Sequence, residues 1–314
     1  MNSLLGGIFL GWSLGANDAA NVFGSAVSSR MLKFWTAAIL AAVFVLIGAL
    51  VAGQSGIETL QGLTHFTSRQ AIVASVAAAC TVTLMTLLGL PVSTSQAVVG
   101  AILGVGLLNR QLNFAGLGKV VVCWLGTPLG GIILGIIVYK LLAAIANSMN
   151  LNIFQSDILL RLCLIAAGSY GAFALGANNV ANVTAVFVGA GMLNLSAATF
   201  IGGLSIGLGI LTFSKGVMET VGKKLVKLDP FSALVVVLAH AVTVHIYALI
   251  GVPVSTSQAV IGAVLGVGII KGVNTIQRRT LAHIFLAWFI TPFVASLFAL
   301  FLDFATHLRY IPGH

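Results

Sequence analysis

One segment of this sequence occurs twice, and this repeat limits the possible folds more than any other feature. Pro91–Gly106 recurs at Pro253–Gly268 with 14 of 16 residues identical, and the two differences exchange Val and Ile. Repetition at a fixed spacing indicates a duplicated structural unit. We therefore expect two homologous halves, 1–147 and 158–314, joined by a linker at 148–157. Three further pairs, at offsets of 161 to 164 residues, support this division: Gly15–Val22 with Gly176–Val183, Ile57–Thr59 with Met218–Thr220, and Trp124–Pro128 with Trp288–Pro292.

Long apolar runs place this duplicated unit in a membrane. Only 7% of the 314 residues are charged, and 59% are apolar, whereas soluble domains are about a quarter charged. About 20 apolar residues cross the ~30 Å hydrocarbon layer as a helix. The composition predicts an all-α, multi-pass membrane protein. The clearest candidate spans are Phe34–Gly53, Gln70–Leu90, Leu117–Ala146, Ile158–Leu175, Phe231–Val252 and Ala282–Leu302.

Each half is interpreted as five membrane segments. The first is expected to break at its Gly-Ala-Asn motif, two full spans follow, and a short helix after Pro-Val-Ser-Thr-Ser precedes a long last helix. Five is an odd number, so the second half inserts upside down relative to the first. Broken helices and re-entrant half-helices of the two inverted repeats would then meet near the midplane of the bilayer.

The distribution of basic residues favours this inverted arrangement. Cytoplasmic loops of membrane proteins carry an excess of Lys and Arg. Inversion places eleven basic residues inside and four outside, with both termini outside a cell membrane. The net charge of +9 is thereby explained without nucleic acid as a partner. The inside set is Arg30, Lys33, Lys140, Arg161, the four Lys of Lys215–Lys227, Lys271, Arg278 and Arg279; the outside set is Arg69, Arg110, Lys119 and Arg309.

One carboxylate falls in the middle of a membrane segment. Asp18 is flanked by Asn17 and Asn21, which are four residues apart and so share a helix face. A charge inside hydrocarbon is costly and indicates a functional site. Small and Asn residues can also simply pack helices together, but packing does not explain a carboxylate. The motif is repeated in the second half as Asn178, Asn179 and Asn182.

The two Pro-Val-Ser-Thr-Ser-Gln segments predict helix N-termini. Ser and Thr cap helices, and the free N–H groups and partial positive charge at a helix start bind anions. Ordinary capped helices at a membrane surface are the alternative, yet capping does not need such identity between halves. We expect an oxyanion to lie between the two ends, with the following ligands: Ser93, Thr94, Ser95, Ser255, Thr256 and Ser257, with Asp18, Asn21 and Asn182.

The predicted anion site lacks a fixed cation. No Lys or Arg lies deep inside a span, and Asp18 adds a further negative charge. A bound metal cation with oxygen ligands would balance the charge. Na⁺ is therefore expected as a coupling ion, without any other cofactor, and H⁺ is the weaker alternative because His240 and His245 are interpreted as core residues. The expected Na⁺ ligands are Asn17, Asp18, Gln96, Asn178, Asn179 and Gln258.

At these motifs the chain resembles the inorganic phosphate transporter (PiT) family. The resemblance rests on Gly-Ala-Asn-Asp-Ala-Ala-Asn at 15–21, its partner at 176–182, and the two Pro-Val-Ser-Thr-Ser-Gln segments. It implies inverted repeats, external termini, a membrane homodimer and cation-coupled phosphate uptake by a sodium/phosphate symporter of prokaryotic type. The chain departs from the family at Asn179, where Asp is frequent, and at Phe44–Leu46, where Glu is frequent.

Two other functions fit the same architecture. A sulfate permease would use the same helix ends, but sulfate has no proton to donate to Asp18 near neutral pH, whereas phosphate is partly protonated. An anion channel could also be lined by paired half-helices, and only coupled flux separates it from a symporter. An enzyme is not expected, because the sequence shows no nucleophile–base pair and no metal-ligand cluster.

Overall fold

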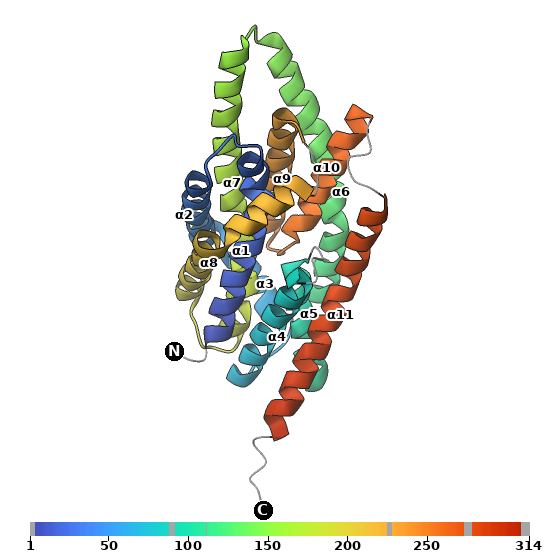
Figure 1. Ribbon diagram of the computed structural model, residues 1–314. Coiled ribbons are helices and arrows are strands. Elements are labelled where there is room, and N and C mark those ends of the chain that lie inside the picture. The colour runs from blue at the N-terminus through green and yellow to red at the C-terminus, as the bar shows by residue number, and fades with distance from the viewer. Residues whose placement is uncertain (1–3, 88–91, 111, 225–227, 273–277, 309–314) are drawn as a thin grey trace, which may run out of the picture.

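The computed structural model describes residues 4–87, 92–110, 112–224, 228–272 and 278–308. Every regular element in these ranges is a helix, and there are eleven (Figure 1). Three residues named above for the repeat or for loop charge, Pro91, Lys227 and Arg309, lie outside the described residues. The helices are α1 (Leu5–Ser28), α2 (Phe34–Ala52), α3 (Gln54–Gln61), α4 (Ser68–Leu87), α5 (Thr94–Asn109), α6 (Phe114–Ser148), α7 (Ile153–Gly189), α8 (Leu195–Lys224), α9 (Pro230–Ile250), α10 (Thr256–Lys271) and α11 (Arg278–Leu308).

The lengths of the helices separate membrane spans from half-helices. Within the described ranges, seven helices are long and apolar enough to cross a membrane: α2, α4, α6, α7, α8, α9 and α11. Helices α5 and α10 have 16 residues each, which gives about 24 Å at 1.5 Å per residue. That is too short for a ~30 Å hydrocarbon layer. The prediction of an all-helical, multi-pass membrane protein with short helices after Pro-Val-Ser-Thr-Ser is confirmed.

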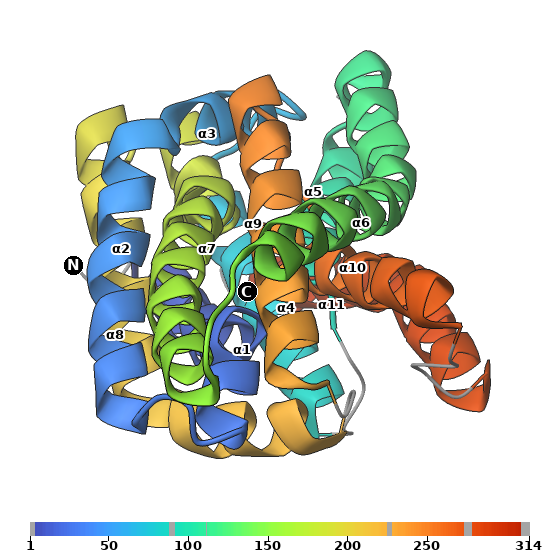
Figure 2. The same cartoon turned by 90° about the horizontal axis from the view of Figure 1, so that it is seen from above.

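Corresponding helices of the two halves exchange partners. Helix α1 packs along α8, and α7, the counterpart of α1, packs along α2. Likewise α5 packs on α11, and α10 packs on α6. Seen from above, α1, α2, α7 and α8 gather on one side, and α5, α6, α10 and α11 on the other (Figure 2). Such an exchange is what two-fold-related halves would produce; inversion of the halves across a membrane stays a prediction.

Two glycines show how closely the exchanged helices approach. A Cβ atom on Gly15 would lie 2.0 Å from the backbone oxygen of Ile206 in α8. A Cβ atom on Gly176 would lie 1.9 Å from the backbone oxygen of Val45 in α2. Gly15 corresponds to Gly176 in the repeat, and Val45 corresponds to Ile206, so the two contacts are equivalent. Each Gly-Ala-Asn motif therefore begins where its helix touches a helix of the other half.

The two ends of the molecule differ in the connections that they carry. Helix α1 begins and α11 ends at one end, and the α6–α7 connection lies at the opposite end (Figure 1). That connection is Met149–Asn152, inside the predicted linker. Helix α7 starts five residues before the expected span at Ile158, because Asn152 and Gln155 form a capping box at its N-terminus. The division of the chain into two halves stays a prediction, as does the side of the membrane on which the termini lie.

The prediction that the first segment of each half breaks at its Gly-Ala-Asn motif is wrong. Helices α1 and α7 run without interruption through residues 15–21 and 176–182. Asn side chains interrupt helices when they bond to their own backbone. Here the second-half amides bond to other side chains and to the start of α10, as described below, so the helix keeps its backbone hydrogen bonds. The chain instead leaves helical structure before Thr94 and before Thr256.

Candidate functional site

The carboxylate of Asp18 lies at the meeting point of α1, α7 and α10. Its side chain is buried, with 3% of the residue exposed. Oδ2 accepts hydrogen bonds from Thr256 Oγ1 at 3.0 Å and from Asn179 Nδ2 at 3.1 Å. Oδ1 accepts a longer bond of 3.4 Å from Asn21 Nδ2, which also donates to Thr256 Oγ1 at 3.3 Å. Both Gly-Ala-Asn motifs and one Pro-Val-Ser-Thr-Ser segment therefore meet at a single charge.

The second-half amides form a connected network around Asn179. Asn178 Nδ2 and Asn182 Nδ2 each donate to Asn179 Oδ1 at 2.9 Å. Asn178 also pairs with the backbone of Val254, accepting from its N–H and donating to its oxygen, both at 2.8 Å. Asn182 Nδ2 reaches Ser95 Oγ in α5 at 2.9 Å. Helix α7 thus connects the starts of α5 and α10.

The two helix starts are capped and bonded to each other. Ser93 Oγ accepts from the Gln96 N–H, and Ser255 Oγ accepts from the Gln258 N–H, each at 3.3 Å. The next hydroxyls cross between the halves, as Ser95 Oγ donates to the Val254 oxygen at 2.9 Å and Ser257 Oγ donates to the Val92 oxygen at 3.2 Å. Ser257 is also 3.0 Å from Ser255 Oγ. The predicted caps are present, and they lie in the protein interior rather than at a surface.

Four buried oxygen atoms of these motifs have no hydrogen-bond partner within the described part of the chain. They are Thr94 Oγ1, Gln96 Oε1, Asn182 Oδ1 and Gln258 Oε1. A buried polar atom without a partner costs about 1–3 kcal/mol, so such atoms indicate a missing donor or cation. All four are hard oxygen ligands of the kind that alkali and alkaline-earth cations prefer. The residues therefore fit both ions: N–H groups and hydroxyls for an anion, and unpaired oxygens for a cation.

Asn17 is a predicted ligand whose side chain lies outside this network. It is half-buried, and no hydrogen bond involves its side chain among the described residues. The side chain of its counterpart Asn178 makes three hydrogen bonds. The two motifs therefore occupy different environments, although their sequences are nearly alike. The backbone N–H and oxygen of Val254, which sequence analysis did not single out, supply the contact that Asn17 lacks; their position between the Pro and the capping Ser of the motif was the available signal.

The two histidines of α9 also differ from each other. His245 Nδ1 lies 2.7 Å from Tyr170 Oη, as expected for a core histidine with a neighbouring partner. His240 is fully buried, and neither of its ring nitrogens has a partner among the residues that the structure describes. His245 thus has the expected partner but is only half-buried, whereas His240 is a core residue without the expected partner in the described part of the chain.

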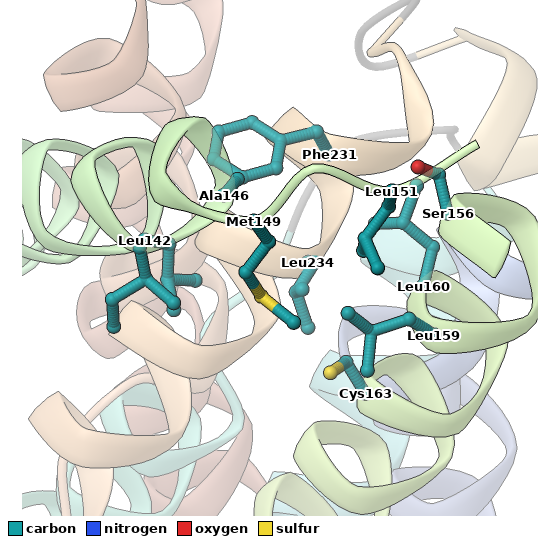
Figure 3. A pocket seen from close by; sticks show the side chains of 11 residues that line it. Leu142, Ala146, Met149, Leu151, Ser156, Leu159, Leu160, Cys163, Phe231 and Leu234 are labelled. Carbon is teal, nitrogen blue, oxygen red and sulfur yellow. The ribbon is translucent and has the colours of Figure 1, made fainter. Parts of the chain in front are cut away.

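An apolar cavity lies elsewhere in the molecule. It has a volume of about 220 Å³ and is bounded by the end of α6 and the starts of α7 and α9 (Figure 3). Apart from Ser156 and Cys163, its lining side chains are hydrocarbon or thioether groups such as Leu142, Met149 and Phe231. This lining offers an oxyanion one hydroxyl and no positive charge, so the cavity is not the anion site.

A helical membrane protein that buries two capped helix starts, one of them bonded to a buried carboxylate, has the organisation of a membrane transporter. Comparison with protein families agrees with this class. The model of the phosphate transporter family matches residues 14–158 and again residues 146–299. The chain therefore belongs to the phosphate transporter family, which confirms the resemblance seen in the motifs. Members of this family are transporters, so the chain is not an enzyme.

Individual relatives cover nearly the whole chain. The sulfate permease CysP of Bacillus subtilis is 31% identical over 93% of this chain and 84% of its own length. A protein of Methanocaldococcus jannaschii named "Putative phosphate permease MJ0630" is 28% identical over 92% of both chains. A solved structure named "The sodium-dependent phosphate transporter" superposes with a TM-score of 0.85 at 23% identity, covering 98% of this chain and 100% of that one. This similarity establishes the fold.

Proposed function

We propose that the protein is a Na⁺-coupled symporter of inorganic phosphate in the cell membrane, active as a homodimer with both termini outside. The observation that carries this proposal is the combination of two buried helix starts, one carboxylate and four unpaired oxygens within one set of motifs. Family membership supports phosphate transport. Coupling to Na⁺ is supported by charge and by the name of the structural neighbour.

The starts of α5 and α10 would hold the anion. Each helix start carries about half a positive charge and N–H groups without intrahelical partners. The hydroxyls of Thr94 and Thr256 are buried beside these ends, and Thr256 already donates to Asp18. Phosphate would receive hydrogen bonds from the ends of both halves.

A cation is needed because the positive charge of the helix starts is already balanced. The two ends together supply about one positive charge, which Asp18 offsets. A bound oxyanion then leaves at least one negative charge uncompensated in a site without Lys or Arg. The unpaired oxygens of Gln96, Gln258 and Asn182 are suitable Na⁺ ligands, and a Na⁺ ion there would neutralise the loaded site. The structural neighbour is named as sodium-dependent.

Sulfate is the second candidate, and the relation to the sulfate permease CysP favours it. Hydrogen bonding distinguishes the two anions. Protonated phosphate can donate to an acceptor, and Asp18 Oδ1 has only the 3.4 Å bond from Asn21, so it has acceptor capacity left. Sulfate would leave that acceptor with the long Asn21 bond alone. The burial of the motif residues favours tight binding and coupled transport over an anion channel.

Uptake into proteoliposomes tests the proposal directly. Phosphate and sulfate uptake are measured with an inward Na⁺ gradient, with an equal K⁺ gradient, and with a pH gradient at constant Na⁺. The expected result is phosphate accumulation only with Na⁺, with sulfate competing weakly. Phosphate uptake that is unchanged without Na⁺ and follows the pH gradient alone would refute Na⁺ coupling. Accumulation of sulfate in preference to phosphate would reassign the substrate, and downhill flux without coupling would indicate a channel.

A further inference from the structure

We propose that the side-chain amide of Asn179 takes the place of a coupling cation beside Asp18, so that this chain moves one cation fewer per anion than a site with carboxylates in both halves would. The inference rests on the proposed cation-coupled transport. It concerns the number of cations, which the family and the relatives leave open.

The two residues are related by the repeat and touch each other. Asp18 and Asn179 occupy the same position in the two Gly-Ala-Asn motifs, 161 residues apart. Their side chains meet across the interface of α1 and α7, with Asn179 Nδ2 3.1 Å from Asp18 Oδ2. Both residues are buried: Asp18 is 3% exposed and Asn179 is 1% exposed. One half thus supplies a carboxylate, and the other supplies a neutral N–H donor directed at it.

The orientation of the Asn179 amide is determined by a chain of contacts that begins at the backbone. The Val254 N–H can only donate and its oxygen can only accept, so they fix which end of the Asn178 amide is which. Asn178 must then present its NH₂ group to Asn179, which accepts through Oδ1. Asn182 donates to the same oxygen. The NH₂ group of Asn179 is therefore left facing Asp18, where it serves as a hydrogen-bond donor.

A carboxylate at position 179 would change the charge requirement of the site. Its second oxygen would replace the Nδ2 atom 3.1 Å from Asp18 Oδ2. Two ionised carboxylates in such contact repel each other strongly. The pair is stable only if a cation binds between them or if one carboxylate takes up a proton. The present Asn179 avoids this requirement because its N–H satisfies the Asp18 oxygen without bringing a charge.

Thr94 and Thr256 occupy the same repeat position but differ in their hydrogen bonds, as expected if only one half supplies a carboxylate. Thr256 donates to Asp18 at 3.0 Å. Its counterpart Thr94 is equally buried, at 4% exposure, yet its hydroxyl has no partner in the described part of the chain. The Asp18 carboxylate therefore bonds to the start of α10 and not to the start of α5. A second cation has no second carboxylate to bind.

The coupling ratio of an Asn179→Asp variant tests this inference. In proteoliposomes with fixed Na⁺ and phosphate gradients, the membrane potential at which net phosphate flux is zero gives the number of cations per anion. We expect Asn179→Asp to add one positive charge per phosphate, taken up as Na⁺ or as a proton. At low Na⁺ and neutral pH its uptake should fall at least tenfold below wild type, and it should recover at high Na⁺ or at acidic pH. An unchanged ratio in an active variant would overturn the inference.

Two further variants control for position and charge. In Asn147→Asp the same charge is added at an exposed residue of α6 outside both motifs, and the coupling ratio should stay that of wild type. The exchange Asp18→Asn with Asn179→Asp keeps one carboxylate and one amide in contact. Because the charge of the pair is unchanged, this double variant should bind the same number of cations as wild type, and one more bound cation would contradict our reasoning.

A binding measurement keeps the inference testable if Asn179→Asp does not transport. The unfolding midpoint in detergent is recorded against Na⁺ at constant ionic strength, with choline as the replacement cation. A cation that binds only the folded state raises this midpoint. The unfolding midpoint of Asn179→Asp should depend more steeply on Na⁺, or on pH, than that of wild type. If the midpoints of variant and wild type respond alike to Na⁺ and alike to pH, the inference is refuted. If the wild type takes up no phosphate, the proposed function fails, whereas this comparison still decides the role of Asn179.

Discussion

Replacing Asp18 with Asn removes the one charge that the described residues place where the two Gly-Ala-Asn motifs meet. Asn has almost the same shape as Asp, but one of its two polar atoms donates. Asp18 now accepts from Thr256, Asn179 and Asn21. In Asp18→Asn, the side-chain oxygen of the new Asn can still accept from Thr256 and Asn179. Its NH₂ group then faces the NH₂ group of Asn21, and two donors cannot bond to each other. At least one of the three bonds is therefore lost.

The charge sets the size of the expected effect on cation binding. A monovalent cation about 4 Å from a carboxylate gains roughly 4 kcal/mol at an effective dielectric constant near 20. Since 1.4 kcal/mol is a factor of ten in affinity, loss of the charge should weaken Na⁺ binding by up to about 10³-fold. Hydrogen bonds to a charged acceptor also weaken, from about 1.5–3 to about 0.5–1.5 kcal/mol each. Folding should not suffer, because a carboxylate inside a membrane helix costs about 2.5–3.5 kcal/mol on insertion scales.

Radiolabelled phosphate uptake at matched protein levels in proteoliposomes measures this change. We expect Asp18→Asn to insert as well as wild type, to lose transport, and to show residual phosphate binding that no longer responds to Na⁺. Asp157→Asn is the matched control, because Asp157 forms an exposed ion pair with Arg161 at 2.8 Å outside the site. Transport by Asp18→Asn within twofold of wild type, with the same Na⁺ dependence, would show that Asp18 is structural and that our mechanism is wrong.

Two more predictions follow from single side chains. Thr94→Val removes a buried hydroxyl that has no partner within the described ranges, so the unfolding midpoint should stay or rise. The KM for phosphate should increase by about tenfold, as for one lost hydrogen bond to a charged group. An unchanged KM would assign Thr94 to packing alone. In a cysteine-free background, Ser196→Cys and Ser148→Cys place thiols beyond opposite ends of α7. A membrane-impermeant reagent should label Ser196→Cys in intact cells and Ser148→Cys only after permeabilisation, and labelling of both from one side would exclude the proposed topology.

The sequence was informative wherever local chemistry decides the structure. Ser93 and Ser255 cap their helices as the Ser-Thr-Ser pattern predicts. The carboxylate in an apolar segment marked Asp18, and the repeat indicated which residues of the second half would correspond to it. The start of α7 was also readable, because Asn152 and Gln155 have capping-box spacing, but the expected span began at the apolar run instead.

Features that depend on contacts between distant segments could not be predicted. The continuity of α1 and α7 depends on partners for their Asn side chains, and those partners lie up to 235 residues away, as Thr256 does from Asn21. The same holds for Asn17 and Asn178, which have identical chemistry and repeat position. Only the packing shows that one is bonded to the start of α10 and that the other is not.

The difference between Asn17 and Asn178 leads to a matched pair of variants. Asn178→Ala leaves the Val254 N–H without its partner, while the Val254 oxygen still accepts from Ser95. One buried donor without a partner costs about 1–3 kcal/mol, so this variant should unfold at a lower midpoint. Asn17→Ala removes a side chain that has no hydrogen bond to any described residue, and it should leave the midpoint almost unchanged. Because the two positions are equivalent in the repeat, equal midpoints for both variants would show that the Asn178–Val254 contact does not stabilise this arrangement of the helices.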